Sequence, residues 1–434
     1  MIVNFVFLFS VLLIMYVSIK KPIVSYYALI FTLPFEAFQF GSVFFTPIKI
    51  FGILAVLSFL FYAIQTCKFD TLFAKNDIRI VLWLFFLFIG SVFYGGVVIE
   101  SISMLFNFFS MLLIYFLTLY YLKQFDQIKF LFLVFSVSFA LMTVLSLIEH
   151  LDIFSTSQAL GISGDLRLGN SRFLGYLRNP NRYAFQALFA LAGCFFLLKI
   201  YKGTIIKIYL ILLTSIITFG VMISYSRTGI IAVILMTFLF LILNRQLKAL
   251  FFTIFFAISL LFIISLMNIN EIQVFDYQYA LDRLNIDKAF SSGSMIARTD
   301  IFNTALENFY NSPLLGVGTG GLLDTYTLSG GLSANNTHNL ALSLLSQYGL
   351  VGFTLFSILL IKIIIRHARI YSDFKSSDIS NIKALNNIYI SIFVAVIVHG
   401  LSHDILLRKW LYIMIAISPI ILLVIQNLYR RTRL

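Results

Sequence analysis

The sequence predicts an all-α integral membrane protein of about thirteen transmembrane helices, and three observations lead to this fold class. Of its 434 residues, 60% are hydrophobic and only 11% are charged, with a mean hydropathy of +0.98. Soluble domains carry roughly 25% charged residues. Apolar runs of about 17–25 residues recur along the chain, long enough to cross the hydrocarbon layer as helices. Basic clusters separate these runs at every second junction.

The expected spans follow the apolar runs in chain order. They lie near residues 2–19, 23–40, 47–66, 80–98, 101–122, 129–148, 182–199, 205–223, 229–244, 249–267, 338–361, 388–403 and 410–428. The first run has no basic leader and is followed by Ile19-Lys20-Lys21 rather than a small-residue cleavage site, so we expect it to remain as a span. No internal repeat or low-complexity linker is visible, which predicts a single polytopic domain over residues 1–434.

Basic residues set the expected topology. Twenty of the 31 lysines and arginines would share one side, which the positive-inside rule assigns to the cytoplasm together with the C-terminus. The net charge of +13 is therefore explained by loop anchoring, and no nucleic-acid partner is expected. The seven cytoplasmic patches are Lys20–Lys21, Lys68–Arg79, Lys123–Lys129, Lys199–Lys207, Arg245–Lys248, Lys362–Lys383 and Arg430–Arg433.

Eleven basic residues remain on the opposite side, and eight of them are arginines. Exported segments normally avoid basic residues, whereas the planar fork of arginine suits phosphate and sugar hydroxyls. The simplest alternative for any one of these arginines is an anchor at the lipid headgroups. The eleven are Lys49, Arg167, Arg172, Arg178, Arg182, Arg227, Arg283, Lys288, Arg298, Arg408 and Lys409.

Two exterior segments are long enough to hold a site, the loop 149–181 and the larger loop 268–337. In the larger loop, Ile301, Ala305 and Phe309 recur at helical spacing, which predicts an amphipathic helix over Met295–Phe309 on the bilayer surface. A glycine-rich turn, Gly316–Gly321, follows it. Because that turn follows no strand, a nucleotide-binding loop is disfavoured.

Three exterior helix starts combine capping residues with arginine or histidine. A helix N-terminus carries about half a positive charge and unpaired N–H groups, so such starts favour a diphosphate. Arg227 lies in a very short turn between two apolar runs, where a charge usually marks function. The three starts are Leu177-Arg178-Asn179-Pro180-Asn181-Arg182, Ser224-Tyr225-Ser226-Arg227-Thr228-Gly229 and Asn335-Asn336-Thr337-His338-Asn339.

His338 is the only one of the five histidines at the mouth of a span beside a long exterior loop. An imidazole can act as general base for an acceptor hydroxyl, although a helix-capping role is the alternative. The exterior acids and histidines show no recognised metal pattern. We therefore expect metal-independent chemistry without a cofactor, in which arginines neutralise a leaving diphosphate. Cys67 and Cys194 lie too far apart in this topology to form a disulfide.

Four stretches between residues 167 and 360 resemble the O-antigen polymerase and O-antigen ligase superfamily of bacterial inner-membrane glycosyltransferases. In that family the arginine of the Ser-Arg-Thr turn, a loop arginine and the His-Asn histidine are associated with catalysis, which by position are Arg227, Arg298 and His338. Gln347 departs from the acidic residue expected before Tyr348-Gly349. The stretches are Arg178–Ala184, Ser224–Gly229, Arg298 through Pro313-Leu314-Leu315-Gly316-Val317-Gly318, and His338-Asn339 with Tyr348-Gly349-Leu350-Val351-Gly352.

The resemblance implies the lipid-donor glycosyltransferase (GT-C-like) class, with a periplasmic active site and undecaprenyl-diphosphate-linked glycans as substrates. Membrane lipids surround the protein, and a chain-length regulator protein is a further partner that the resemblance admits. With Arg227, Arg298 and His338 as catalytic residues, we expect the diphosphate or glycan to be bound by Arg172, Arg178, Asn181, Arg182 and Asn339.

Three functions fit these residues. A polymerase adds one lipid-linked repeat to another, and the high Phe, Ile and Tyr content favours it on compositional grounds alone. A ligase transfers the glycan from the same carrier to lipid A–core. A flippase would need charges at mid-membrane and often internal repeats, whereas the spans contain mainly Glu36 and no repeat.

Overall fold

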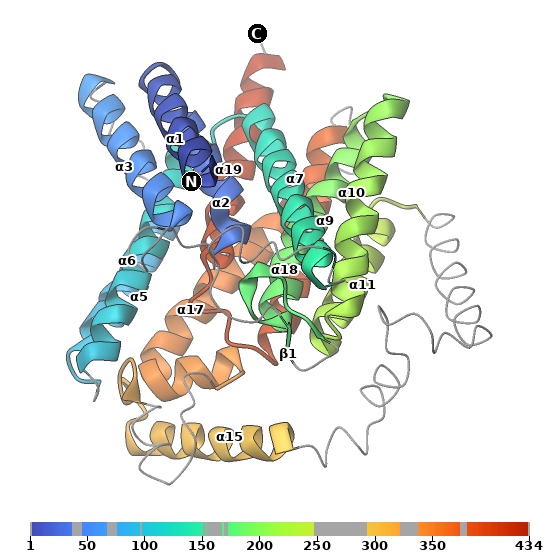
Figure 1. The fold of residues 1–434 in the computed structure, drawn as a ribbon. Helices are drawn as coiled ribbons and strands as arrows, with labels where there is room; N and C mark the ends of the chain where they lie inside the picture. The colour runs from blue at the N-terminus through green and yellow to red at the C-terminus, as the bar shows by residue number, and fades with distance from the viewer. Residues whose placement is uncertain are drawn as a thin grey trace, which may run out of the picture. The chain divides into compact units, whose positions relative to one another are not determined.

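The protein, examined as a computed structural model, is described over residues 2–36, 46–66, 76–95, 98–150, 153, 167–168, 172–246, 293–321, 337–373 and 380–432. These residues are almost entirely helical (Figure 1). The helices are α1 Ile2–Lys20, α2 Ile23–Thr32, η1 Leu33–Phe35, α3 Pro47–Thr66, α5 Asn76–Val92, α6 Val98–Tyr121, α7 Phe125–His150, η2 Gly175–Leu177, α9 Pro180–Ile200, α10 Thr204–Ile223, α11 Arg227–Leu243, α15 Gly293–Asn311, α17 Leu340–Asp373, α18 Ser380–Gly400 and α19 Lys409–Thr432. Two short strands, β1 Arg167–Leu168 and β2 Arg172–Phe173, pair antiparallel.

The all-α membrane fold class is confirmed. Eight helices of the described residues are long and apolar enough to cross a membrane, and three shorter helices are also apolar. A helix lies at each predicted span except 249–267, which falls outside the described residues. The total of thirteen spans and the glycosyltransferase class stay predictions.

The chain folds as two compact units, each composed of separate segments. Unit 1 contains residues 1–66, 124–285 and 376–396, and unit 2 contains residues 67–123, 286–375 and 397–434. Helix α18 runs from the first into the second. The predicted single domain remains a prediction, and each unit is described by itself below.

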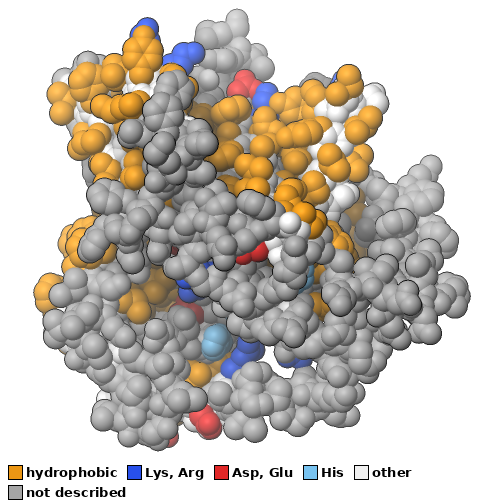
Figure 2. Space-filling view, in the orientation of Figure 1, with side chains coloured by type: hydrophobic (Ala, Val, Ile, Leu, Met, Phe, Trp, Pro, Cys, Tyr) orange, Lys and Arg blue, Asp and Glu red, His pale blue; other side chains and the backbone are white. Residues whose placement is uncertain are grey.

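Unit 1 is organised around α9, which packs against α7, α10 and α11. Small residues let α9 and its neighbours approach closely. Ser136 on α7 donates a hydrogen bond to the carbonyl of Ala190 (2.8 Å), and an added Cβ at Gly193 would meet the Ser136 hydroxyl and the Phe132 backbone. By contrast, Figure 2 shows hydrophobic side chains spread over outward faces of the molecule, and α10 exposes Ile205 and Ile208 (84% and 63%). Such faces suit contact with lipid rather than water.

Unit 2 is organised around α17, which packs against α5, α15 and α19. This helix is broken at Gly349, where φ is +61° and ψ is −162°. The broken turn pairs with the backbone that follows α15: Leu350 N–H donates to Pro313 O (2.8 Å) and Val317 N–H donates to Ser346 O (2.9 Å). Backbone groups freed by a broken membrane helix need such partners, because hydrocarbon offers none.

Glycines make this pairing possible. A Cβ at Gly316 would lie 2.5 Å from the Tyr348 backbone nitrogen, and one at Gly318 would lie 2.7 Å from the Ser91 carbonyl oxygen. The Thr319 hydroxyl then contacts the hydroxyls of Ser91 (2.5 Å) and Tyr348 (3.1 Å). The glycine-rich turn is therefore a backbone lock between α15, α17 and α5. We call it the glycine lock, residues 313–319 with 346–351.

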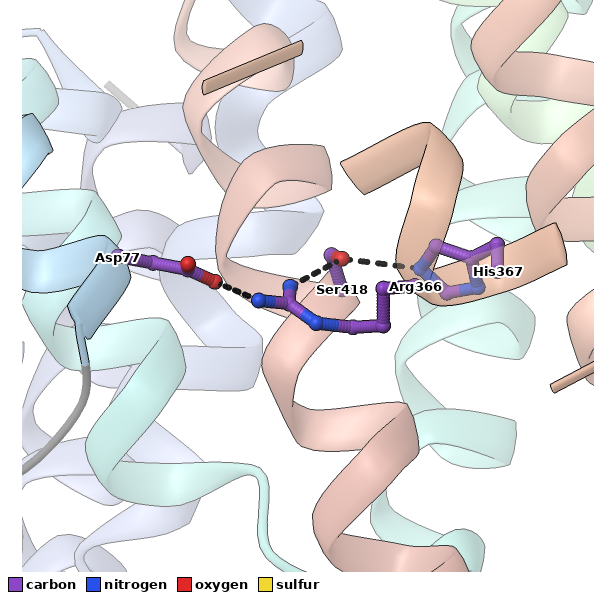
Figure 3. A network of polar contacts seen from close by, with 4 residues as sticks. All are labelled: Asp77, Arg366, His367 and Ser418. Atoms are coloured by element: carbon purple, nitrogen blue, oxygen red, sulfur yellow. Dashed lines mark hydrogen bonds and ion pairs between the residues drawn. The ribbon is translucent and has the colours of Figure 1, made fainter. Parts of the chain in front are cut away.

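The other end of α17 carries a buried polar network (Figure 3). The Arg366 guanidinium forms an ion pair with Asp77 of α5 and donates to the Ser418 hydroxyl of α19 (2.7 Å). The Ser418 hydroxyl also contacts Nε2 of His367 (2.9 Å). Three helices of unit 2 are thus tied together at the end of α17 that is remote from His338.

Candidate active site

The three helix starts singled out from the sequence share an unusual backbone. Among the described residues, four non-glycine residues have positive φ, and three lie in these motifs: Arg178 (53°), Tyr225 (48°) and His338 (53°). The fourth, Arg245, follows the C-terminus of α11. Left-handed backbone at a residue with a side chain is costly and clusters at functional sites. The same conformation at all three motifs supports their assignment as functional.

In unit 1, two of these helix starts are joined directly. The Asn179 side chain caps α9 by accepting from the backbone N–H groups of Asn181 and Arg182 (2.9 and 3.1 Å). The Ser226 hydroxyl caps α11 and donates to Oδ1 of Asn181 (2.7 Å). The two N-termini are therefore neighbours, and their partial positive charges add. Capping by these motifs, predicted from the sequence, is confirmed.

Four arginines surround these joined N-termini. Arg178 and Arg182 are exposed, whereas Arg227 is half-buried as the first residue of α11. The Arg172 side chain of β2 donates from Nε to the Ser224 carbonyl (3.3 Å), so it also braces the turn before α11. Asn181 uses its side-chain oxygen for the Ser226 bond. The binding roles of Arg172, Arg178, Asn181 and Arg182 stay predictions, and the structure adds a positioning role for Asn181.

In unit 2, His338 lies directly before α17. The cap of this helix comes from Asn339, whose Oδ1 accepts from Leu342 N–H (3.0 Å) and whose Nδ2 donates to the Leu401 carbonyl (2.9 Å). The buried Thr337 hydroxyl donates to the Asn339 carbonyl (2.7 Å) and accepts from the Asn339 N–H (3.2 Å). Because Asn339 caps the helix, the half-buried His338 ring is available for another role.

Arg298 belongs to the same part of unit 2. It lies on α15, which occupies the predicted position of the surface helix and buries Ile301 and Ala305. Figure 1 shows this helix running crosswise to α5. Burial lowers the pKa of His338, and the positive charge of Arg298 lowers it further. A lowered pKa favours the neutral imidazole, which is the form that a general base needs.

The glycine lock explains how these two residues come together. Arg298 and His338 are 40 positions apart, but α15 runs into the segment 313–319, which pairs with α17 from Ser346 onward, six residues beyond the start of that helix. Two of the four stretches that carry the family resemblance are therefore hydrogen-bonded to each other. These two stretches, which are distant in the sequence, therefore contact each other through their backbones.

The loop 401–408 between α18 and α19 also joins this site, and the sequence analysis assigned it no role. Asp404 is buried, accepts from the Ser343 hydroxyl (2.8 Å) and accepts from Leu406 N–H (2.9 Å). Gln347 donates to the same Ser343 hydroxyl (2.9 Å). The loop thereby brings His403 to His338, with ring centroids 6.1 Å apart. The sequence signal was a His-x-x-x-His-Asp run, His399 to Asp404, beside the last exterior turn.

Gln347, which departs from the family pattern, has a clear structural place. Its amide and the Asp404 carboxylate both contact Ser343, one turn earlier on α17. Burial raises the pKa of Asp404, while the bonds from Leu406 and Ser343 and the charge of Arg408 oppose that rise. An acidic group is thus present beside the 343–347 turn, but a different segment supplies it.

The fold and these helix starts define a multi-pass membrane protein whose capped helix starts carry arginine in unit 1 and histidine in unit 2. Residues 208–357 match the family model described as O-antigen ligase. The matched segment includes Arg227, Arg298 and His338, and it confirms the resemblance to the O-antigen polymerase and ligase superfamily. A search of curated proteins finds no match.

Proposed function

We propose that this protein is an O-antigen polymerase that joins undecaprenyl-diphosphate-linked repeat units at the periplasmic face of the bacterial inner membrane. The proposal is supported by the glycine lock, which bonds the segment after the Arg298 helix to the helix that follows His338, and by the lowering of the His338 pKa through burial and the charge of Arg298. A cation beside a neutral imidazole provides both an anchor for a diphosphate and a base for an acceptor hydroxyl.

In the proposed reaction, His338 removes the proton from an acceptor hydroxyl while that oxygen attacks the anomeric carbon of the donor. The bond between this carbon and the diphosphate oxygen breaks, and the negative charge moves onto the leaving undecaprenyl diphosphate. Arginines stabilise that charge where it develops. We assign this role to Arg298 and Arg227.

The donor diphosphate needs a binding site that is fixed before reaction. The joined N-termini of α9 and α11 contribute their partial positive charges, and Arg178, Arg182 and Arg227 add full charges. We propose that this cluster of unit 1 binds the diphosphate and that Arg172 holds the turn before Arg227 in place. Arg227→Lys should then lose most activity, because an ammonium group cannot bind two phosphate oxygens side by side.

The test uses purified protein with a synthetic undecaprenyl-diphosphate-linked repeat, with product length read on a gel. We expect His338→Ala to lose elongation by about 100-fold or more, as removal of a general base usually does. His367→Ala is the matched control, since this histidine contacts Ser418 at the end of α17 remote from His338 and should leave elongation intact. Full-length products from His338→Ala would remove the proposed base.

The proposal also requires Arg227 and His338 to act in the same catalytic cycle. If they do, the Arg227→Ala/His338→Ala double variant should lose little more activity than either single variant, because residues of one catalytic unit are strongly non-additive. Multiplicative losses would indicate independent roles.

A ligase is the second candidate, favoured by the description of the matching family model. The same chemistry applies, but lipid A–core is the acceptor. In cells, His338→Ala in a polymerase leaves single repeats on lipid A–core. In a ligase it leaves lipid A–core without repeats and lets polymer accumulate on the carrier. One lipopolysaccharide gel separates the two functions.

A further inference from the structure

A second histidine, His403, is held beside His338 by the loop 401–408. Two contacts dock this loop onto the first turns of α17: Asn339 Nδ2 to the Leu401 carbonyl (2.9 Å), and the Ser343 hydroxyl to Asp404 (2.8 Å). His403 lies between these two anchors in sequence. Its position is therefore fixed by the same helix start that carries His338.

The two rings meet edge to face. Their planes are 86° apart, with centroids separated by 6.1 Å. The His399 ring also lies near His403, with centroids 4.9 Å apart, and the Ser402 hydroxyl lies 3.2 Å from Nδ1 of His403. Within the described residues, no three His, Cys, Asp or Glu side chains are arranged to hold a metal ion. This geometry fits a direct contact between the two imidazole rings better than metal binding.

Burial and nearby basic groups favour the neutral form of His403 by lowering its pKa. Burial is the largest cause that lowers its pKa, and His399, Arg298, His338 and Arg408 lower it further. Among the described residues, the side chains that lower this pKa are arginines and histidines, and the neighbouring Asp404 carboxylate is engaged by Ser343 and Leu406. A neutral, polarisable ring next to the His338 imidazole can stabilise the charge that this imidazole gains, as aromatic rings do for nearby cations.

We propose that His403 is a positioning residue for His338, whose neutral ring orients the His338 imidazole and supports the imidazolium formed when His338 takes the acceptor's proton. This inference rests on the proposed role of His338 as base. His403 forms and breaks no covalent bond in the reaction. The proton moves from the acceptor oxygen to His338, and His338 releases it to solvent after the diphosphate departs.

The test compares substitutions that differ in one property each. His403→Phe keeps a neutral aromatic ring, His403→Leu keeps an apolar side chain without a ring, and His403→Gln keeps hydrogen bonding without a ring. Elongation is measured against pH with purified protein and the lipid-linked repeat. We expect Phe to retain activity within about 3-fold and Leu to lose about 10-fold or more, in line with the size of cation–ring interactions.

The pH profile separates support of the imidazolium from simple packing. Without the ring, protonated His338 is less stable, so its pKa falls and the acid limb of kcat/KM moves to lower pH in the Leu variant but not in the Phe variant. Equal profiles for Leu and Phe would overturn the proposal, as would an active Gln variant beside an inactive Phe variant. Unfolding in detergent for all three variants shows whether activity losses reflect misfolding.

The outcomes also distinguish this inference from the proposed function. If His338→Ala elongates normally, the general-base assignment fails first. If His338→Ala is inactive but the Leu and Phe variants behave alike, only the role of His403 fails. If His403→Phe is as inactive as His338→Ala, His403 contributes its ring nitrogens and the proposal is wrong.

Discussion

Replacing Gly349 by alanine tests whether the glycine lock holds the site together. Gly349 has φ +61° and ψ −162°, a region that residues with a Cβ essentially do not occupy. An added Cβ would lie 2.6 Å from the Leu315 backbone nitrogen and closer still to the Leu314 carbonyl. Both neighbours are backbone atoms, so no side-chain rotation relieves the contact.

The expected cost follows from these contacts. The backbone conformation alone costs roughly 1–3 kcal/mol for a non-glycine residue. Relief of the clash must also lengthen the bonds from Leu350 N–H to Pro313 O (2.8 Å) and from Val351 N–H to Leu314 O (3.2 Å), each worth about 0.5–1.5 kcal/mol. The free energy of unfolding should therefore fall by about 2–6 kcal/mol. Displacement of α15 should also weaken the influence of Arg298 on His338.

The measurement is denaturant unfolding of the purified protein in detergent, together with elongation of a lipid-linked repeat. Gly90→Ala is the matched control: it lies in α5 of the same unit, and an added Cβ there has no atom within 4 Å. Alanine in a helix interior should stabilise by about 0.5–1 kcal/mol. If Gly349→Ala unfolds and elongates like Gly90→Ala, the glycine lock does not position the site.

Two further changes test the electrostatics of unit 2. Because the charge of Arg298 lowers the pKa of His338, Arg298→Gln should raise that pKa and move the acid limb of kcat/KM to higher pH. An unchanged acid limb would show that Arg298 does not act on His338. Asp77→Ala leaves Arg366 without its carboxylate partner and should lower the free energy of unfolding by about 3 kcal/mol. The double variant Asp77→Leu/Arg366→Met should recover much of this loss, because it removes both charges. Equal losses for the two variants would contradict a stabilising ion pair at this position.

The helices of this protein were largely predictable from the sequence. Hydropathy placed a span at each described transmembrane helix because every span must satisfy its own backbone in hydrocarbon. The caps Asn179 and Ser226 were predictable for a similar reason, since the bonds of a helix cap are local in sequence. The helix α15 was predicted from the spacing of Ile301 and Ala305, which are both buried, whereas its position at the bilayer surface stays a prediction.

The site was only partly predictable. Arg227, Arg298 and His338 stood out as charged or titratable groups at unusual places, but His403 and Asp404 did not, because their loop follows an ordinary-looking span. Their importance arises from hydrogen bonds to Asn339 and Ser343, which are more than 60 residues away in the sequence. No local pattern records such a contact.

The sequence by itself determined the membrane class, the helix starts and the residue types available for chemistry, because these depend on hydropathy and on bonds between near neighbours. Only the tertiary structure decided that the glycine-rich turn is a backbone lock rather than a phosphate loop, and that His338 shares its surroundings with His403 and Arg298. The physical reason is that both depend on contacts between segments distant in the sequence. The break in α17 frees backbone groups that pair with residues 313–319, and Asn339 and Ser343 bind the loop that carries His403.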